Sequence, residues 1–371
     1  MKFNVIKGDL EKGLKKVYRA IDTRSVMPIL SGIKIEAEGN KLTLTASNNT
    51  LTIQTIVKDV EVEVDGGIVL PAKEIVGLVS AMNEGDVFIN VENNQAFIKN
   101  NKSSVKLNGM DANEYPKVNK DDHSNIFSMT SDVLKDVIGK TVFAVSRIES
   151  RPILMGVNFT KKENELVLTA TDSRRLARLE VEVEELEEFE GFTLPARSLK
   201  SIVTLFEKEE SLNILQSNNN VAIESDDTKV LIRLMSGSYP ETERLIPEGG
   251  NTILTVNKDG FISSLERASI LAKDELVVTF VMTDVQNGIF NTILLKQKST
   301  EVGVSEEEII VEDIEGVELE ISFNVNYVLD ALKALDDEVV KFEFGGHLRP
   351  FTVMNVNDPS ETQLILPVKT F

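Results

Sequence analysis

The sequence predicts an α+β protein built from three copies of one domain, each with two helices and about eight strands. Three observations lead to this prediction. Several landmarks recur at a fixed spacing along the chain. Short segments alternate between apolar and polar residues, as strands do, and each copy has two stretches with the apolar spacing of a helix. A chain of 371 residues is also too long for one ordinary domain.

Internal repetition is the strongest of the three signals. "PILSGIKIEAEGNKLTLTASN" begins at Pro28 and "PILMGVNFTKKENELVLTATD" begins at Pro152, 124 residues later, and the two align without a gap. The prolines of "LPAKEIVGLV" and "LPARSLKSIV" (71 and 195) keep this spacing, as do those of "EYP" and "SYP" (116 and 240). Three landmarks with one spacing indicate a duplicated domain.

A third and more divergent copy follows from about Asn251. "NKDGFISSLERASIL" takes the place of "KGDLEKGLKKVYRAI", and "FNVNYVLDALKAL" takes the place of "LPAKEIVGLVSAM". Because this repeat is far longer than that of a solenoid, each copy is predicted to be a whole domain. The predicted domains are residues 1–123, 124–248 and 249–371.

The first copy shows the order of elements. The strand "KFNVI" is followed by a helix on which Leu10, Leu14, Val17 and Ile21 share one face. The strands "GIKIEAE", "KLTLTAS" and "LTIQTIV" come next, and a second helix, "PAKEIVGLVSAM", begins with a proline, which the first turn tolerates. "DVFINV", "QAFIKN" and "SVKLN" close the copy as strands. The two helices are expected to pack on one face of the sheet.

Composition excludes several classes of protein. The chain has no cysteine, so disulfides and thiolate metal sites are excluded. The N-terminus "MKFNVIKGDL" lacks the apolar run of a signal peptide, and no window is long enough for a membrane span. We therefore expect a cytoplasmic protein with no membrane partner. The net charge of -20 argues against nucleic-acid binding, unless the basic residues gather on one surface.

The first helix does gather basic residues. At 100° per residue, Lys12, Lys15, Lys16 and Arg19 fall on the face opposite the apolar one. The sequence therefore predicts an outward stripe of bases on this helix. If the copies are arranged around an axis with their helices inward, such bases would line a positive interior within an acidic protein.

The segment "TATDSRRL" (residues 169–176) allows three interpretations: an active site, a nucleic-acid contact or some other role. The chain has only two histidines, His123 and His347, without metal-ligand spacing, and it has no GxxxxGK loop. Asp172 has no matching acid in the first copy, where Asn48 stands. An enzyme is therefore disfavoured, and Asp172 is better explained as a turn-stabilising residue.

Several motifs together resemble one family: "PIL", "TATDSRRL", "SGSYPETERLIP", "FNVNYVLDALKAL" and "QLILPVKTF". The chain is similar to the bacterial DNA polymerase III β subunit, the β sliding clamp. This resemblance implies the DNA clamp fold and a head-to-tail homodimer, a six-domain ring around double-stranded DNA. It also implies a nucleoid-associated processivity subunit that has no catalytic activity and no cofactor. The implied partners are the replicative polymerase α subunit, the clamp loader and other proteins with a clamp-binding motif.

The resemblance also implies a hydrophobic peptide-binding pocket between the second and third domains. Aliphatic side chains and rigid prolines would form a groove for a short peptide, with polar groups at its rim. Ser173 and Arg174 stand where some members of the family have Gly and His. The implied pocket residues are Leu154, Thr171, Ser173, Arg174, Arg175, Leu176, Pro240, Arg244, Leu245, Pro247, Leu348, Pro350, Leu364, Leu366, Pro367 and Val368.

Two further sets of residues follow from the resemblance. The dimer contact would join Val105 and Leu107 of one subunit to Ile270 and Leu271 of the other. The family's channel residues correspond to Arg24 and Lys73, and repeat symmetry adds Arg147 and Arg197 as DNA contacts. The alternative is a three-domain protein-interaction scaffold that does not encircle DNA, but such a scaffold would leave the basic stripe without a partner.

Overall fold

The computed structural model describes residues 1–22, 27–117, 123–271, 276–282, 292–299 and 303–369. They form two compact units whose division runs through the second copy. The first unit contains Met1–Lys135, Val183–Phe189 and Arg197–Leu234, and the second contains Asp136–Glu182, Glu190–Ala196 and Met235–Phe371. None of the helices in these described parts combines the length and the apolar character that a membrane crossing needs.

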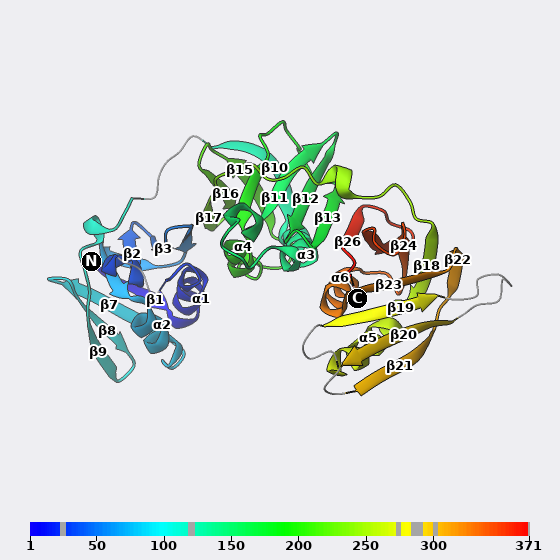
Figure 1. The fold of residues 1–371 in the computed structure, drawn as a ribbon. Coiled ribbons are helices and arrows are strands. Elements are labelled where there is room, and N and C mark those ends of the chain that lie inside the picture. The colour runs from blue at the N-terminus through cyan, green and yellow to red at the C-terminus, as the bar shows by residue number, and fades with distance from the viewer. Residues whose placement is uncertain (23–26, 118–122, 272–275, 283–291, 300–302, 370–371) are drawn as a thin grey trace. The chain divides into compact units, whose positions relative to one another are not determined.

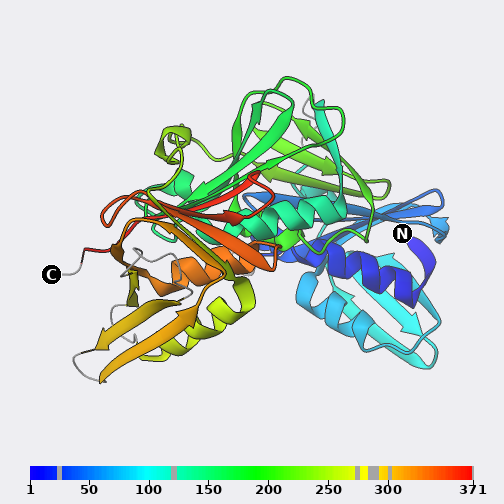
Figure 2. The same ribbon diagram turned by 90° about the vertical axis from the view of Figure 1, so that its right-hand side faces the viewer.

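The first copy has two antiparallel groups of strands and two helices. One sheet has the order β5 (Glu61–Val64), β1 (Lys2–Ile6), β7 (Asp86–Glu92), β8 (Gln95–Asn100) and β9 (Ser103–Asn108). The other group has the order β6 (Gly66–Pro71), β2 (Gly32–Glu38), β3 (Lys41–Ser47) and β4 (Leu51–Val57). The helices α1 (Lys7–Tyr18) and α2 (Ala72–Ser80) lie side by side (Figures 1 and 2).

The second copy repeats this plan. Its first group of strands has the order β10 (Ser124–Thr130), β15 (Ser211–Gln216), β16 (Asn220–Glu224) and β17 (Thr228–Arg233). Its second group has the order β14 (Phe192–Pro195), β11 (Gly156–Lys162), β12 (Glu165–Thr171) and β13 (Arg175–Val181). The helices are α3 (Ser131–Thr141) and α4 (Ala196–Ile202).

The third copy has the same two groups. The first has the order β22 (Asp313–Gly316), β18 (Thr252–Asn257), β24 (Val339–Phe344), β25 (Phe351–Asn355) and β26 (Glu361–Ile365). The second has the order β23 (Leu319–Asn324), β19 (Val277–Met282), β20 (Thr292–Ser299) and β21 (Gly303–Ile310). The helices α5 (Lys258–Leu271) and α6 (Val325–Ala334) lie side by side (Figures 1 and 2).

Short 3-10 turns connect some of these elements: η1 (Pro28–Ser31), η2 (Ala112–Glu114), η3 (Val142–Ala144), η4 (Pro152–Met155) and η5 (Glu243–Leu245). The α+β class and the three-copy organisation are therefore confirmed. The sequence did not predict β5 and β6, because "EVEV" is short and acidic and "GGIVLP" begins with two glycines. The proposed domain boundaries remain a prediction.

Edge strands join successive copies into continuous sheets. β4 of the first copy pairs antiparallel with β17 of the second, with Thr55 opposite Thr228, which makes one eight-stranded sheet. β13 of the second copy pairs with β26 of the third, with Leu179 opposite Glu361, which makes one nine-stranded sheet. β4 and β13 begin 124 residues apart, at 51 and 175, so the same edge of the repeat is used at both junctions.

The apolar faces predicted for the helices are buried. Leu10, Leu14 and Val17 of α1 are fully buried. In the third copy, Phe342 lies in a cluster of rings, 5.4 Å from Phe261 and 6.0 Å from Phe344, measured between ring centroids. Burial of large aromatic side chains contributes much of a core's stability, so this cluster holds α5 against the sheet.

Replacing Phe342 with Ala is expected to destabilise the third copy by about 3–5 kcal/mol, because the side chain is fully buried and the cavity would not collapse completely. Urea unfolding followed by a probe in the third copy measures this loss. Val317→Ala is the matched control, since Val317 is 60% exposed, and it should change the free energy of unfolding by less than about 0.5 kcal/mol.

Candidate functional site

The corner between β12 and β13 is closed by its own side chains. The Asp172 carboxylate accepts hydrogen bonds from the backbone N–H groups of Arg174 (2.9 Å) and Arg175 (3.0 Å). The Thr171 hydroxyl donates to the Arg175 carbonyl at 2.6 Å. Ser173 has a φ of 73°, a left-handed conformation that glycine adopts most easily. The prediction that Asp172 stabilises a turn is therefore confirmed.

Arg175 lies beneath this corner and joins the second copy to the third. Its guanidinium donates to Asp330 on α6 at 2.6 Å and to the Phe143 carbonyl at 2.8 Å. It also pairs with Asp172 at 3.2 Å and lies 4.5 Å from the ring centroid of Tyr327. The expectation that Arg175 lies at the rim of a groove is wrong for its side chain, which is only 8% exposed. A buried guanidinium needs several acceptors, and the corner and α6 supply them.

Three partners of Arg175 were not predicted from the sequence: Phe143, Tyr327 and Asp330. Tyr327 and Asp330 lie in "FNVNYVLDALKAL", whose pattern predicts a helix but no contact with Arg175. They lie three residues apart, so they share one face of α6. Pairing between positions 155 residues apart in the sequence leaves no local pattern, which is why it was not predicted.

The chain that follows β26 runs along the same corner. The Leu366 N–H donates to the Arg174 carbonyl at 2.9 Å, and the Val368 N–H donates to the Ser322 carbonyl at 2.7 Å. Leu364 lies opposite Leu176 in the ladder of β13 and β26. The structure therefore brings residues of the second and third copies together at this corner, as the sequence analysis expected.

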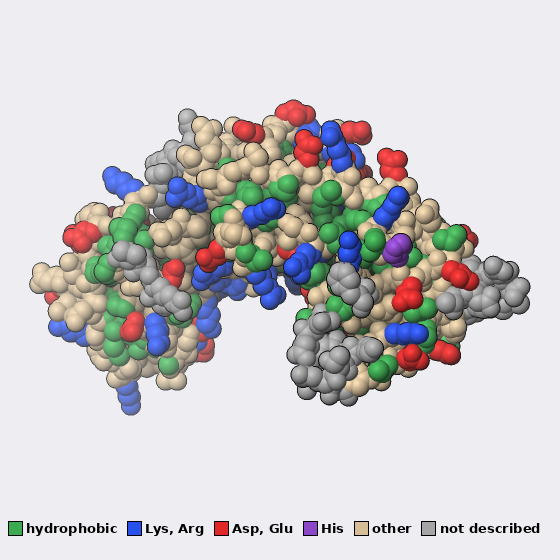
Figure 3. Space-filling model, viewed as in Figure 1, with side chains coloured by type: hydrophobic (Ala, Val, Ile, Leu, Met, Phe, Trp, Pro, Cys, Tyr) green, Lys and Arg blue, Asp and Glu red, His purple; other side chains and the backbone are tan. Residues whose placement is uncertain are grey.

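The predicted pocket residues include both exposed and buried aliphatic side chains. Leu366, Leu348 and Leu245 are 38%, 51% and 55% exposed, while Leu154 and Leu176 are buried. Figure 3 shows hydrophobic side chains over the region of β13 and β26, with Lys or Arg and a histidine nearby. The other predicted pocket residues vary in burial: Thr171 is buried, Pro247, Pro350, Pro367 and Val368 are half-buried, and Ser173, Arg174, Pro240 and Arg244 are exposed.

Ion pairs hold the segment that carries Arg244 and Leu245. Glu243 pairs with Lys162 on β11 at 3.2 Å and lies 3.8 Å from Arg178 on β13. The hydrogen bond with Glu243 and the charge of Glu180 raise the pKa of Lys162 above its ordinary value. These contacts fix η5 beside the strands and leave Leu245 facing solvent.

The predicted DNA contacts are exposed where the structure describes them. Lys73 and Arg197 are the second residues of α2 and α4, and both are exposed, as is Arg147. Arg24 lies outside the described residues. The role of these residues as DNA contacts remains a prediction.

The prediction of an outward basic stripe on α1 is wrong for part of the stripe. Lys16 is buried, and its ammonium lies 3.2 Å from Asp227 and 3.0 Å from the Thr228 hydroxyl at the start of β17. Lys12 pairs with Glu207, and Arg19 donates to the Thr204 hydroxyl at 2.6 Å. These bases therefore hold α1 against the second copy. A helix that packs beside the strands joining two copies comes close to acidic side chains of the next copy.

The predicted dimer contacts occupy unpaired edges and an exposed helix end. Val105 and Leu107 are half-buried on β9, which has β8 as its sole neighbour in the described residues. Ile270 is 67% exposed near the end of α5. The side chain of Leu271 lies outside the described residues.

Three family models match successive parts of the chain. They are the N-terminal domain (residues 1–119), the central domain (128–241) and the C-terminal domain (243–369) of the DNA polymerase III beta subunit. The chain belongs to the DNA polymerase III β subunit family. These β subunits have the three-domain plan that the internal repeats predict.

Known β subunits are similar over their full length. The beta sliding clamps of Staphylococcus aureus and Staphylococcus epidermidis are each 34% identical to this chain, with 100% of both sequences covered. The crystal structure of the DNA polymerase sliding clamp from Bacillus subtilis matches with a TM-score of 0.95 and 34% identity, covering 100% of both chains. The β chain of Streptococcus pneumoniae matches with a TM-score of 0.94 and 32% identity over 100% of both chains.

Arg175→Met is expected to lower the free energy of unfolding by about 2–4 kcal/mol, because Asp172 and Asp330 would lose a partly buried partner. Arg175→Lys should recover little, since an ammonium cannot replace the planar guanidinium over Tyr327. Thermal unfolding measures both. Arg174→Met, a change at the adjacent exposed arginine, is the control, and an equal loss there would contradict the assignment.

Proposed function

We propose that two copies of this chain form a closed sliding clamp that encircles duplex DNA and tethers the replicative polymerase without catalysing a reaction. The observation that carries this proposal is the use of sheet edges. At both junctions within the chain, an edge strand of one copy pairs with the last strand of the next copy. β4 pairs with β17, and its equivalent β13 pairs with β26. The same rule leaves two edges for a second chain: β21 of the third copy and β9 of the first.

The register of this contact follows from the repeat. β21 alternates as β4 does, with Glu307 and Ile309 facing inward where β4 has Thr55 and Val57. Thr55 lies opposite Thr228, and the first-copy equivalent of Thr228 is Ser103, because Ser103, Val105 and Leu107 share one face of β9 as Thr228, Val230 and Ile232 share one face of β17. Ser103 would therefore lie opposite Glu307 of the other chain. In an antiparallel ladder this register places Val105 opposite Ser305.

Charge and exposure favour this contact. β9 and the turn before it carry Lys102 and Lys106, whereas β21 carries Glu306 and Glu308. Val304 on β21 is 64% exposed. An exposed apolar side chain on an edge strand favours association with another strand. Such a contact is heterologous, so closure with two chains gives a ring with no free edge of this kind.

The groove beside β13 and β26 suits a short linear peptide with leucine and aromatic anchors. Exposed Leu245, Leu348 and Leu366 would contact the anchors, and Arg174 would lie at the rim. Partners such as the polymerase α subunit, the clamp loader and other clamp-binding proteins would compete for this one groove. Tethering through the groove raises the local concentration of the polymerase at the primer end.

DNA binding by a ring needs few contacts. Lys73, Arg147, Arg197 and Arg24 are the proposed phosphate contacts, and they offer only a weak, salt-dependent attraction. A ring that slides must not read bases, so phosphate contacts suffice. The net charge of -20 keeps DNA from the rest of the surface, and the protein would act at the nucleoid.

Leu366→Asp is expected to weaken binding of a fluorescein-labelled, polymerase-derived peptide at least 100-fold, because a charge would be desolvated in the groove. Fluorescence anisotropy measures the affinity. Val356→Asp is the matched control, since Val356 is 41% exposed but lies outside the groove. Unchanged peptide affinity in Leu366→Asp would contradict the groove assignment.

Ile270→Asp should convert the dimer to a monomer, because the proposed interface would bury an unpaired charge. Sedimentation or light scattering measures the mass. Ile148→Asp is the control, since Ile148 is also 67% exposed and lies in the loop between η3 and η4. A dimer that survives Ile270→Asp, or equal dissociation of both variants, would contradict the proposed interface.

Topological binding predicts retention on circular DNA. Protein loaded on a nicked circle should remain through gel filtration at moderate salt and should be lost once the circle is linearised, because a ring slides off a free end. Equal loss from both forms would favour a scaffold that does not encircle DNA. Replacing Lys73, Arg147 and Arg197 with Ala should reduce loading but preserve this dependence on topology.

A further inference from the structure

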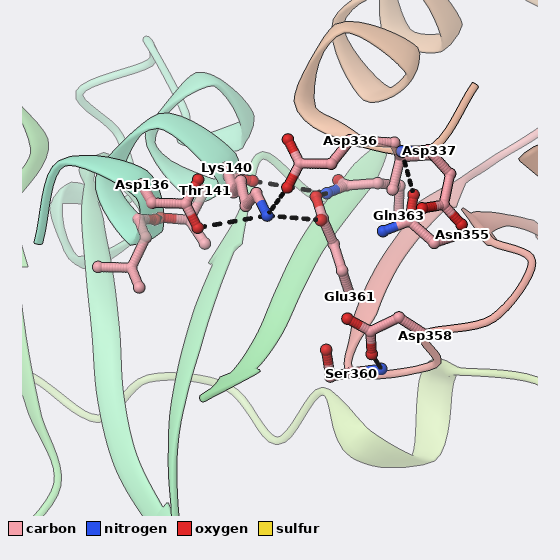
Figure 4. Close-up of polar contacts among 12 residues, drawn as sticks. Asp136, Lys140, Thr141, Asp336, Asp337, Asn355, Asp358, Ser360, Glu361 and Gln363 are labelled. Carbon is pink, nitrogen blue, oxygen red and sulfur yellow. Dashed lines mark hydrogen bonds and ion pairs between the residues drawn. The ribbon is translucent and has the colours of Figure 1, made fainter. Parts of the chain in front are cut away.

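A cluster of charges around one buried carboxyl group lies at the junction of the second and third copies. Figure 4 shows Lys140 of α3 with carboxylates that come from different elements. Its ammonium lies 2.6 Å from Asp336, 3.2 Å from Asp136 and 3.3 Å from Glu361. Glu361 is 1% exposed, whereas Asp336 and Asp136 are 73% and 52% exposed. Lys140 is therefore the cation that reaches the buried carboxylate.

Repeat symmetry shows that Lys140 occupies a junction position. Lys140 lies 124 residues after Lys16, and both are on the first helix of their copies. Lys16 reaches Thr228, which begins β17, and Lys140 reaches Glu361, which begins β26. Thr228 and Glu361 are equivalent, because each lies opposite the same position of the preceding copy's edge strand. One helix position thus supplies a cation to both inter-copy ladders.

The two junctions differ in what the cation meets. At the first junction, the buried acceptor is the neutral Thr228 hydroxyl, and the acid, Asp227, is 35% exposed. At the second, the buried acceptor is the carboxyl group of Glu361. One Glu361 oxygen accepts from Gln363 at 3.2 Å, and the other faces the Lys140 ammonium at 3.3 Å without the geometry of a hydrogen bond. A buried carboxylate that is satisfied only in part is costly when ionised.

We propose that Lys140 and Glu361 are positioning residues for the peptide groove, and that proton uptake by Glu361 tightens the pairing of β26 with β13. β26 runs from Glu361 to Ile365, and the next residue, Leu366, is exposed in the groove. A shift at the start of the strand therefore passes along the ladder to Leu364 and Leu366. This inference rests on the proposed groove for its functional consequence, but not for the behaviour of the strand.

Burial, rather than the charges around Glu361, sets the direction of the effect. Lys140 faces Glu361 from α3 and Asp336 from the turn after α6, whereas Asp136 pairs with Lys140 and the Asp358 carboxylate accepts from the Ser360 N–H at 2.9 Å. Burial raises the pKa of Glu361 to about 7, although the Lys140 charge opposes this shift. Burial alone would lower the pKa of Lys140, but the hydrogen bond with Asp336 and the nearby acids raise it overall. Lys140 therefore stays charged near neutral pH, while Glu361 titrates.

A raised carboxyl pKa determines whether the stability of the strand pairing rises or falls with pH. The stabilisation that Glu361 provides to the paired strands is complete below its ordinary pKa of 4.5 and is lost as pH rises toward about 7. Between pH 6 and pH 8 the pairing should weaken about tenfold. In contrast, the pKa of Asp227 is lowered, so the first junction should not respond in this range.

Hydrogen–deuterium exchange of residues 362–366 at pH 6 and pH 8, corrected for intrinsic rates, tests this inference on the full chain. In the wild type, exchange through opening should be about tenfold faster at pH 8. Glu361→Gln should abolish this dependence and slow exchange at pH 8 below the wild-type rate. Asp227→Asn is the matched control and should retain the wild-type response. The double variant Lys140→Met/Glu361→Gln should also lose the pH dependence, so the test survives if one single variant fails to fold.

Peptide affinity provides the second readout. The affinity for the labelled polymerase-derived peptide should fall by up to tenfold from pH 6 to pH 8 in the wild type and stay constant in Glu361→Gln. Equal pH dependence of exchange in the wild type and in Glu361→Gln would overturn the inference. Should exchange follow the predicted pattern while the peptide binds at neither pH, the groove assignment fails and the positioning of β26 stands.

Discussion

Pairing of edge strands between successive copies is the interaction on which the rest of the structure depends. β4 with β17 and β13 with β26 turn separate sheets into an eight-stranded and a nine-stranded sheet. Backbone hydrogen bonds make such joints directional, so each copy is added in the same sense. The second of these joints places the end of the chain beside the corner at Asp172, where the peptide groove is proposed. β9 and β21 each have one neighbouring strand among the described residues, so in the proposed ring the same kind of pairing would join two chains.

The sequence predicted much of this architecture because its causes are local. Strands such as β2, β3 and β4 match their predicted segments, since alternation of apolar residues is visible in a short window. The turn role of Asp172 was also predictable, because an acid two residues before an N–H needs no distant partner. The repeat supplied the remaining information, since a fixed spacing of 124 residues relates positions that no local pattern connects.

The contacts that sequence analysis did not predict are ion pairs between copies. Arg175 was expected at a rim and is instead buried against Asp330, and Lys16 was expected on an outer face and is buried beside Asp227. In both cases, helical periodicity or a sequence motif gives the direction of a side chain only relative to its own helix or strand. Whether that direction leads to solvent depends on the next copy. The exposed cations Lys73, Arg147 and Arg197 therefore carry the DNA-binding hypothesis better than the stripe on α1.

Oxidation of engineered cysteines tests the central claim, pairing of β9 with β21 of a second chain, most directly. The natural chain has no cysteine, so Val105→Cys and Ser305→Cys would supply its sole thiols. Residues directly opposite in an antiparallel ladder lie close enough for a disulfide. The account predicts a covalent dimer on a non-reducing gel from the Val105→Cys/Ser305→Cys variant, and none from Val105→Cys/Val317→Cys. Failure of the first pair to crosslink, or equal crosslinking of both, would contradict it.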